Sequence, residues 1–154
     1  MKPTNQEPGQ NTVKIMPKTP LARFFFKGLV TGRSFFFVAS LAAPHRLLRL
    51  LQIRGDGTPA PMLLRMFGVR NGALALGLSH LHHFRAPRRF VAINVICDVI
   101  DALAFIDAGR RREISRTGAT VTTAIAASAI GAGAITYANL PSGSKNDFPD
   151  RHAA

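Results

Sequence analysis

Four long stretches of mainly apolar residues alternate along the chain with short polar or basic links. They cover residues 20–43, 62–80, 90–107 and 118–140, and the last has twenty-three residues without a charge. A helix needs about twenty apolar residues to cross a hydrocarbon core about 30 Å thick. The pattern therefore predicts an all-α fold, a four-helix transmembrane bundle that occupies residues 19–140.

The first stretch has helix signals at both ends. Thr19 is a typical N-cap, and Pro20 suits the first helical position, where an N–H would have no helical partner. Pro44 predicts that the helix ends at Ala43. Three basic residues lie in the early half of this stretch: Arg23, Lys27 and Arg33. We expect this half to stay outside the hydrocarbon core, or its cationic groups to reach the headgroups.

A short leucine-rich stretch, residues 45–53, follows the first span. About nine residues are too few to cross the core, so we expect a short interfacial helix on the membrane surface. A segment rich in Gly and Pro, residues 55–61, then interrupts the chain. Residues 1–18 are basic, polar and rich in Pro, and residues 141–154 are polar, so both segments are predicted to be disordered tails.

The charge distribution supports a membrane location. The chain of 154 residues is 47% hydrophobic, yet it has 20 Lys and Arg against 8 Asp and Glu. The arginines gather in the links between the apolar stretches: Arg46, Arg49 and Arg54, then Arg85, Arg88 and Arg89, then Arg110, Arg111, Arg112 and Arg116. This pattern is typical of loops beside membrane spans, and it predicts a bilayer with anionic lipids as the electrostatic partner.

A soluble, basic, helical protein that binds nucleic acid is an alternative. Against it, the arginine clusters alternate with long apolar runs instead of lining one face, and no recognisable reading module is present. We therefore expect no nucleic-acid partner.

Four spans would place both tails on the same side of the membrane. That side has eleven Lys and Arg residues if the early half of the first stretch belongs to it, and the opposite side has seven. An excess of positive residues favours the cytoplasmic side. We predict a multi-pass protein of the cell (inner) membrane with cytoplasmic termini.

Charged and amide residues inside two of the apolar stretches need partners. Asn94, Asp98 and Asp101 are spaced so that they share one face of a helix. If the second and third stretches form an antiparallel hairpin, Arg70 lies level with the two aspartates. The predicted intramembrane charge cluster comprises Arg70, Asp98, Asp101, Asn94, Asn71 and, nearer the membrane edge, Arg65.

Two interpretations of this cluster compete. An isolated charge at the bilayer centre costs at least about 2.5 to 3.5 kcal/mol, and an opposite charge beside it lowers that cost. The favoured interpretation is that Arg70 locks the helices together through Asp98 and Asp101. The alternative is that the same groups line a path for a proton, an ion or a ligand. No second titratable relay is visible, which favours the structural interpretation.

Small residues predict close packing between helices. Gly68 and Gly72 form a G-x-x-x-G pair in the second span, and Gly77 lies on a different face of the same helix. Ala127, Gly131 and Gly133 are further candidates in the last span. We expect the second span to contact its neighbours on more than one side.

No arrangement of residues indicates catalysis. The chain has no G-x-S-x-G motif, P-loop, dinucleotide fingerprint or H-E-x-x-H motif. His80, His82 and His83 form only a weak pattern for zinc, which prefers defined ligand spacing with Cys or carboxylate partners. We expect no metal site, no catalytic residue and no cofactor, and the protein is not expected to be an enzyme.

Some of these residues recur as a pattern: Arg65, Gly68 and Arg70 as R-x-x-G-x-R, Gly77 seven residues further on, and Asp98 with Asp101 as D-x-x-D. The pattern resembles uncharacterised families of small bacterial four-helix integral membrane proteins, over roughly residues 29–140. The resemblance implies the fold and a membrane location, but no reaction or substrate. The basic first span departs from it.

These observations favour a structural or accessory membrane protein that binds a partner, either a second copy of the chain or another membrane protein. The alternative is a small transporter, or an element that conducts ions or protons through the charge cluster. Such an element would need oligomerisation, because four short helices enclose little space.

Overall fold

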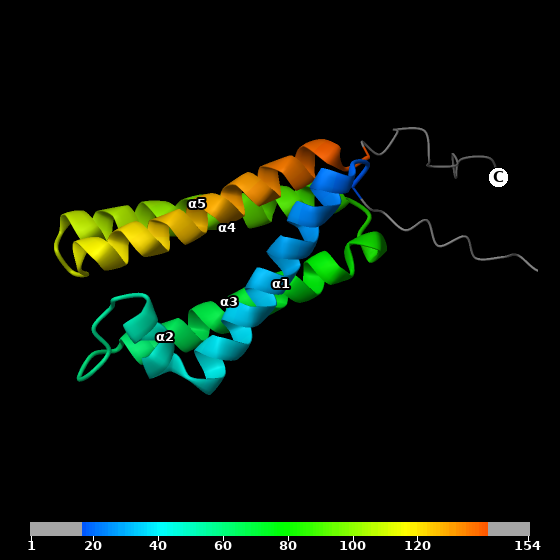
Figure 1. Ribbon diagram of the computed structural model, residues 1–154. Coiled ribbons are helices and arrows are strands. Elements are labelled where there is room, and N and C mark those ends of the chain that lie inside the picture. The colour runs from blue at the N-terminus through cyan, green and yellow to red at the C-terminus, as the bar shows by residue number, and fades with distance from the viewer. Residues whose placement is uncertain (1–16, 142–154) are drawn as a thin grey trace, which may run out of the picture.

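The computed structural model describes residues 17–141, and this part of the chain is all-α. Its elements are α1 (Pro20–Ala42), α2 (Pro44–Leu50), α3 (Ala60–Ser79), a short 3-10 helix η1 (Leu81–His83), α4 (Pro87–Arg110) and α5 (Arg116–Asn139). Within the described residues there is no β-strand (Figure 1). The all-α class is therefore confirmed, and the four long helices correspond to the four apolar stretches.

The helix ends follow from local capping. The Thr19 hydroxyl accepts a hydrogen bond from the backbone N–H of Ala22 at 3.2 Å, and α1 ends with Ala43 as its C-cap. This confirms both predicted ends of the first helix. At α5 the Ser115 hydroxyl accepts from the N–H of Gly118 at 2.9 Å, which satisfies a backbone donor that the helix leaves unpaired.

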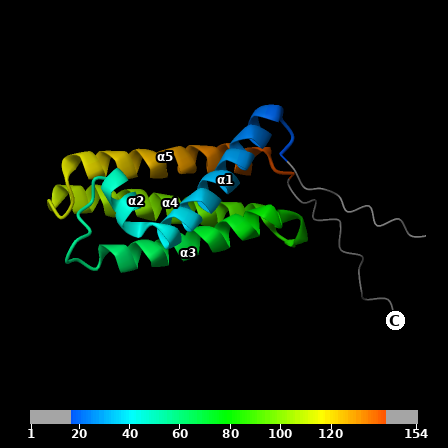
Figure 2. The same cartoon turned by 60° about the horizontal axis from the view of Figure 1, so that its bottom comes forward.

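The long helices form two tightly packed pairs, α1 with α3 and α4 with α5. Figures 1 and 2 show α4 and α5 running side by side, while α1 crosses over α3 and meets α5 with its early half. In contrast, α3 and α4 touch only sparsely, although they follow each other in the chain. The predicted hairpin of the second and third spans is thus a loose one.

Two apolar clusters hold these pairs together. One joins α1, α3, α4 and the end of α5 through Leu29, Leu78, Leu81, Val91 and Leu140. The other joins α2 to α3 through buried leucines that include Leu47, Leu48 and Leu64.

The short second helix is confirmed, but the sequence analysis did not predict that its leucines pack against the rest of the protein. Leu47, Leu48 and Leu51 are buried against the rest of the protein, and only Leu50 is strongly exposed. The carbonyl of Gln52 also accepts a hydrogen bond from the Ser115 hydroxyl at 3.0 Å. The segment therefore tethers α2 to the start of α5.

The glycines of α3 pack on two different neighbours, as predicted. A Cβ added to Gly68 would lie 2.5 Å from the Ser40 Cβ, and one added to Gly72 would lie 2.7 Å from the Phe37 ring, both in α1. Gly77, on another face, lies against the ring of Phe90 in α4.

The prediction for Gly131 was wrong. It lies on the exposed face of α5, and a Cβ added there would meet nothing within 4 Å. Gly133, which the sequence analysis also named, makes the close contact, with Val95 of α4. The two residues lie on different faces of α5, and only one of those faces meets α4.

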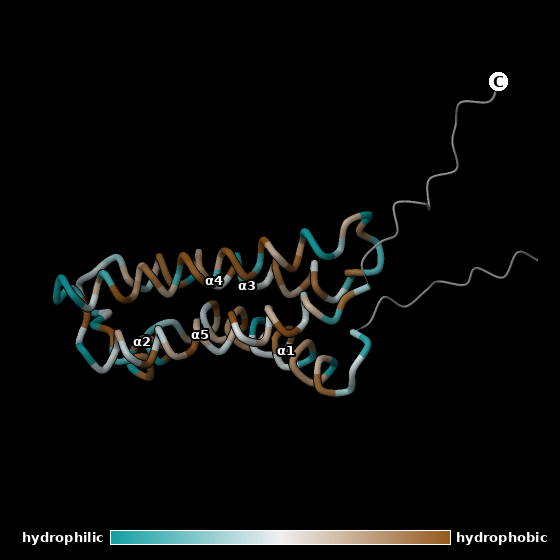
Figure 3. Tube along the Cα trace, turned by 90° about the horizontal axis from the view of Figure 1, so that it is seen from above, coloured by the Kyte–Doolittle hydropathy of each residue, from teal (hydrophilic) through white to brown (hydrophobic). Residues whose placement is uncertain are grey.

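Apolar side chains also cover the outside of the bundle. Exposed large residues of α3 and α4 include Leu63, Met66, Val69, Ile96 and Ile100. Figure 3 shows hydrophobic residues along these helices and hydrophilic residues gathered in the links at the two ends. Two helices, α1 and α5, are long and apolar enough to cross a membrane.

The predicted tails, residues 1–18 and 141–154, lie almost wholly outside the described residues. Pro17 and Lys18 are described, and they pack onto the folded part of the chain. Pro17 is buried, and the N–H of Lys18 donates to the carbonyl of Asn139 at 3.2 Å. Two residues that the sequence analysis assigned to the first tail therefore belong to the folded part of the chain.

Candidate functional site

A buried ion pair between α1 and α4 lies near the centre of the bundle. One terminal nitrogen of Arg33, Nη2, donates to both carboxylate oxygens of Asp98, at 2.9 and 2.7 Å. The side chains of Arg33 and Asp98 are only 5% and 7% exposed. Both charges are therefore shielded from the surroundings and depend on each other.

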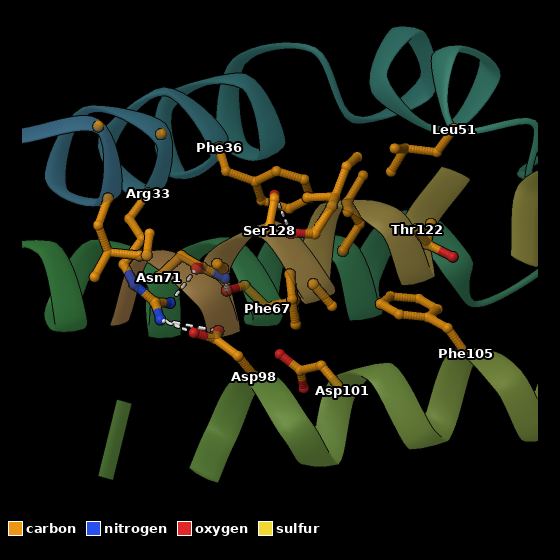
Figure 4. A pocket seen from close by; sticks show the side chains of 18 of the residues that line it. Arg33, Phe36, Leu51, Phe67, Asn71, Asp98, Asp101, Phe105, Thr122 and Ser128 are labelled. Carbon is orange, nitrogen blue, oxygen red and sulfur yellow. Dashed lines mark hydrogen bonds and ion pairs between the residues drawn. The ribbon is translucent and has the colours of Figure 1, made fainter. Parts of the chain in front are cut away.

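Asn71 of α3 completes this pair. Its Oδ1 accepts a hydrogen bond from Nη1 of Arg33 at 2.8 Å, and its Nδ2 donates to the carbonyl of Phe67 at 3.0 Å. The second bond fixes the orientation of the amide, so that its oxygen faces the guanidinium. Arg33 therefore links three helices, α1, α3 and α4 (Figure 4).

A second ion pair joins α3 to α4 one helical turn away. Nη1 of Arg70 donates to Oδ1 of Asp101 at 3.0 Å, and Nη2 donates to Oδ2, which gives a two-pronged contact. The guanidinium of Arg70 also lies 4.5 Å from the centre of the Phe67 ring. This pair is less enclosed, because the side chains of Arg70 and Asp101 are 36% and 13% exposed.

The two pairs form one charge-balanced site: Arg33 and Arg70 on one side, Asp98 and Asp101 on the other. We call it the paired-charge site. Both carboxylates come from α4 and both cations come from the α1–α3 pair. The site therefore fastens the two halves of the bundle where α3 and α4 otherwise touch only sparsely.

The sequence analysis placed Arg70 against both aspartates, and the structure corrects this in part. Arg70 does meet Asp101, but the partner of Asp98 is Arg33, which we had expected outside the core or at the headgroups. The signal that points to Arg33 is the charge balance: two buried acids need two cations. Arg33 is also close to the middle of α1, where its side chain cannot easily reach a membrane surface.

The remaining predicted members of the cluster have other roles. Asn94 is fully buried, and its Nδ2 donates to the carbonyl of Phe90 at 2.9 Å, but no hydrogen bond joins it to the ion pairs. Among the described residues, its Oδ1 has no hydrogen-bond partner. Arg65 is exposed on α3 and forms no ion pair with a described residue. Its position near a membrane edge stays a prediction.

A hollow of about 610 Å³ adjoins the paired-charge site. Its walls come from all five α-helices and are mostly apolar, with rings such as Phe36, Phe67 and Phe105. Asp98 and Asp101 lie on the wall contributed by α4 (Figure 4). Two glycines of α1, Gly28 and Gly32, also line it, and neither has a neighbour within 4 Å of an added Cβ.

The histidines at the end of α3 form a cluster of rings. The ring centres of His82 and His83 are 3.9 Å apart, and His80 stacks on both. Within residues 17–141, no group of three or more His, Cys, Asp or Glu side chains is arranged to hold a metal ion.

In comparisons with protein-family models, curated proteins and solved structures, none matches this chain. The resemblance to small four-helix membrane proteins therefore stays a prediction.

Proposed function

We propose that this chain is a multi-pass membrane protein in which α1, α3, α4 and α5 each cross the bilayer. The observation that carries the proposal is the paired-charge site, in which Arg33 and Arg70 neutralise Asp98 and Asp101. Arg70 of α3 meets Asp101 of α4 inside the bundle, and the outer faces of both helices carry large apolar side chains.

Composition alone favours only two spans, since α1 and α5 pass a test of length and hydropathy. Arg65, Arg70 and Asn71 lower the hydropathy of α3, and Asp98, Asp101 and Asp107 raise the charge of α4. All but Arg65 and Asp107 of these belong to the paired-charge site or bond to it. A paired charge is less costly in lipid than an isolated one, so the pairing supports four spans.

The low burial of the two most apolar helices supports the same proposal. In α1 and α5, 22% of the residues of the most apolar stretch are buried. A core helix of a soluble protein is mostly buried, because water surrounds the molecule. Lipid would cover the apolar residues that the bundle leaves exposed.

Within this class we propose a structural or accessory role in the cell (inner) membrane, with a second copy or another membrane protein as the partner. Both carboxylates of the site already accept hydrogen bonds from arginine, as expected of groups that fasten helices. The long apolar faces of α3 and α4 offer area for a partner helix or for lipid.

Carbonate extraction of membranes tests the membrane location. We expect the full chain to stay with the membrane pellet, as spanning helices do. Release into the supernatant would contradict the proposal and favour a soluble basic protein that binds nucleic acid.

The role of the ion pair is tested with Arg70→Ala. We expect a lower amount of protein in the membrane and a lower unfolding temperature in detergent, because Asp101 loses its partner. The double variant Arg70→Ala/Asp101→Ala should recover part of the loss, and Arg65→Ala, on an exposed face of the same helix, should have little effect. If Arg70→Ala keeps its level and packing but abolishes a flux or a phenotype, the structural role is wrong.

A transporter or conducting element is the second candidate, favoured by the hollow that reaches Asp98 and Asp101. It predicts a flux of protons or ions across proteoliposomes that contain the purified chain. The substitution Asp101→Asn should abolish this flux. This second candidate also predicts an oligomer in native mass spectrometry, since a single copy encloses little space. A monomer without flux supports the accessory role.

A further inference from the structure

The hollow beside the paired-charge site has the size and shape of a binding site for one elongated molecule. Its volume of about 610 Å³ lies within the range of about 300 to 1,000 Å³ that is typical of ligand pockets. Along α1 its wall runs from Phe24 to Phe36, a rise of about 18 Å at 1.5 Å per residue. This length fits an extended hydrocarbon chain better than a compact molecule.

The lining selects an apolar body. Most of the wall consists of aliphatic and aromatic side chains, with Gly28 and Gly32 leaving room on the α1 side. The α5 side presents small residues such as Ala129 and Ala132 at the same hollow. A hydrocarbon chain in the hollow would contact mainly apolar side chains. It would leave free hydrogen-bond positions of the protein unpaired only beside the paired-charge site.

The polar groups of the lining indicate which polar group the ligand can have at its other end. The deciding feature is the set of hydrogen-bond positions that these groups leave free. A carboxylate offers about four acceptor positions, and each aspartate of the site receives only two hydrogen bonds, all from arginine. Thr122 and Ser128 give their hydroxyl hydrogens to backbone carbonyls at 2.7 Å, so only their oxygens are left. The amide of Asn71 is occupied on both sides. The lining therefore has free acceptor positions on both carboxylates, and among its described donors the Nε–H of Arg33 has no partner. A hydroxyl group suits such a wall, because it can both donate and accept.

The charge balance then excludes an ionic headgroup. Arg33, Asp98 and Asp101 line the hollow, and Arg70, which does not line it, neutralises Asp101 from α3. Each carboxylate on the wall is therefore already matched by one cation, and no charge is left over to neutralise an ion. A ligand anion would meet carboxylates whose cations are already taken, and it would lose its hydration without a partner. A ligand with a hydroxyl group could donate to a free acceptor without bringing a charge.

We propose that this hollow binds one molecule of a neutral, mostly hydrocarbon amphiphile, whose terminal hydroxyl donates a hydrogen bond to the Asp98–Asp101 wall. The proposal does not depend on how many helices cross a membrane, because the hollow is formed by residues of a single folded chain and opens to its surface. The binding experiment and the carbonate extraction therefore fail independently.

The test is native mass spectrometry of the full chain in detergent, titrated with hexadecanol and, separately, with hexadecanoate. We expect one hexadecanol per chain, bound at least about tenfold more tightly than hexadecanoate, which has the same hydrocarbon length and a negative charge. Equal or tighter binding of hexadecanoate would contradict the charge argument. No binding of hexadecanol to the folded chain would overturn the proposal.

Two matched variants locate the ligand. Gly32→Leu fills the hollow, and Gly131→Leu adds the same side chain on α5 outside it; neither glycine has a neighbour within 4 Å of an added Cβ. We expect Gly32→Leu to weaken hexadecanol binding about tenfold or more, and Gly131→Leu to change it less than about twofold. Equal effects of both would place the ligand elsewhere. Circular dichroism checks that each variant is folded. Gly28→Leu is a second variant that fills the hollow.

Discussion

Arg33 is the residue on which the buried polar contacts converge. It bonds to Asp98 and Asn71 and is 5% exposed, so its loss leaves a carboxylate without a cation. Truncating one partner of a buried ion pair typically costs about 3 to 5 kcal/mol, whereas replacing both partners by apolar residues is often neutral or stabilising.

We therefore predict that Arg33→Met lowers the free energy of unfolding by about 3 to 5 kcal/mol, measured by thermal or chemical unfolding in detergent. The double variant Arg33→Met/Asp98→Leu should recover most of this loss. Lys27→Met is the matched control, because it removes a cation from an exposed position of the same helix. A single variant as stable as the control would show that Asp98 does not need Arg33.

The sequence analysis predicted the ion pair of Arg70 with Asp101, but it did not predict the ion pair of Arg33 with Asp98. Asp98 and Asp101 stand out because they interrupt an apolar helix. An antiparallel hairpin of the second and third apolar stretches brings Arg70 to the same level. Arg33 lies 65 residues before Asp98, and no local pattern links the two helices that carry them. Its basic neighbours, Arg23 and Lys27, also made it look like part of an exposed face.

At the scale of elements, the glycines of α3 determine how closely it approaches α1. Gly68 lies against Ser40 with no room for a methyl group, while Gly131 of α5 faces open space. The same substitution should therefore have opposite effects at the two positions.

We predict that Gly68→Ala lowers the free energy of unfolding by about 1 to 3 kcal/mol, because the added Cβ must push α1 away. Gly131→Ala should raise it by up to about 1 kcal/mol, since alanine favours a helix and meets no neighbour. Unfolding temperatures of both variants check this. A stabilising Gly68→Ala would mean that α1 and α3 pack less closely than described.

The elements themselves were predictable because their signals are local. Thr19, Pro20 and Pro44 determine where α1 begins and ends without help from the rest of the chain. The choice of contacting glycines is less local, because a small residue in a helix does not reveal which face meets a neighbour. Gly77 fitted that expectation, whereas in α5 the contact falls on Gly133.

At the scale of the whole molecule, four spans would put both termini on one side of the membrane. With Arg33 buried in the bundle, the eleven Lys and Arg residues of that side become ten, against seven on the other side. The excess still favours cytoplasmic termini. We predict that a reporter active only in the cytoplasm works when fused after residue 154 or before residue 1, and that it fails when inserted at residues 55–58. Opposite activities at the two ends would require an odd number of spans.

Both carboxylates of the paired-charge site come from α4, which is made after the helices that carry the two cations. This order has a consequence for biosynthesis. Arg33 and Arg70 are translated before Asp98 and Asp101, and Asp98 follows Arg33 by 65 residues. Ribosomes add about 5 to 20 residues per second, so the first half of a nascent chain would wait several seconds with both cations unmatched. If these helices cross a membrane as proposed, lateral release of α1 and α3 into lipid would be unfavourable until α4 arrives. A chain that stops before residue 98 should accordingly stay bound to the insertion machinery or be degraded, instead of accumulating as a stable fragment.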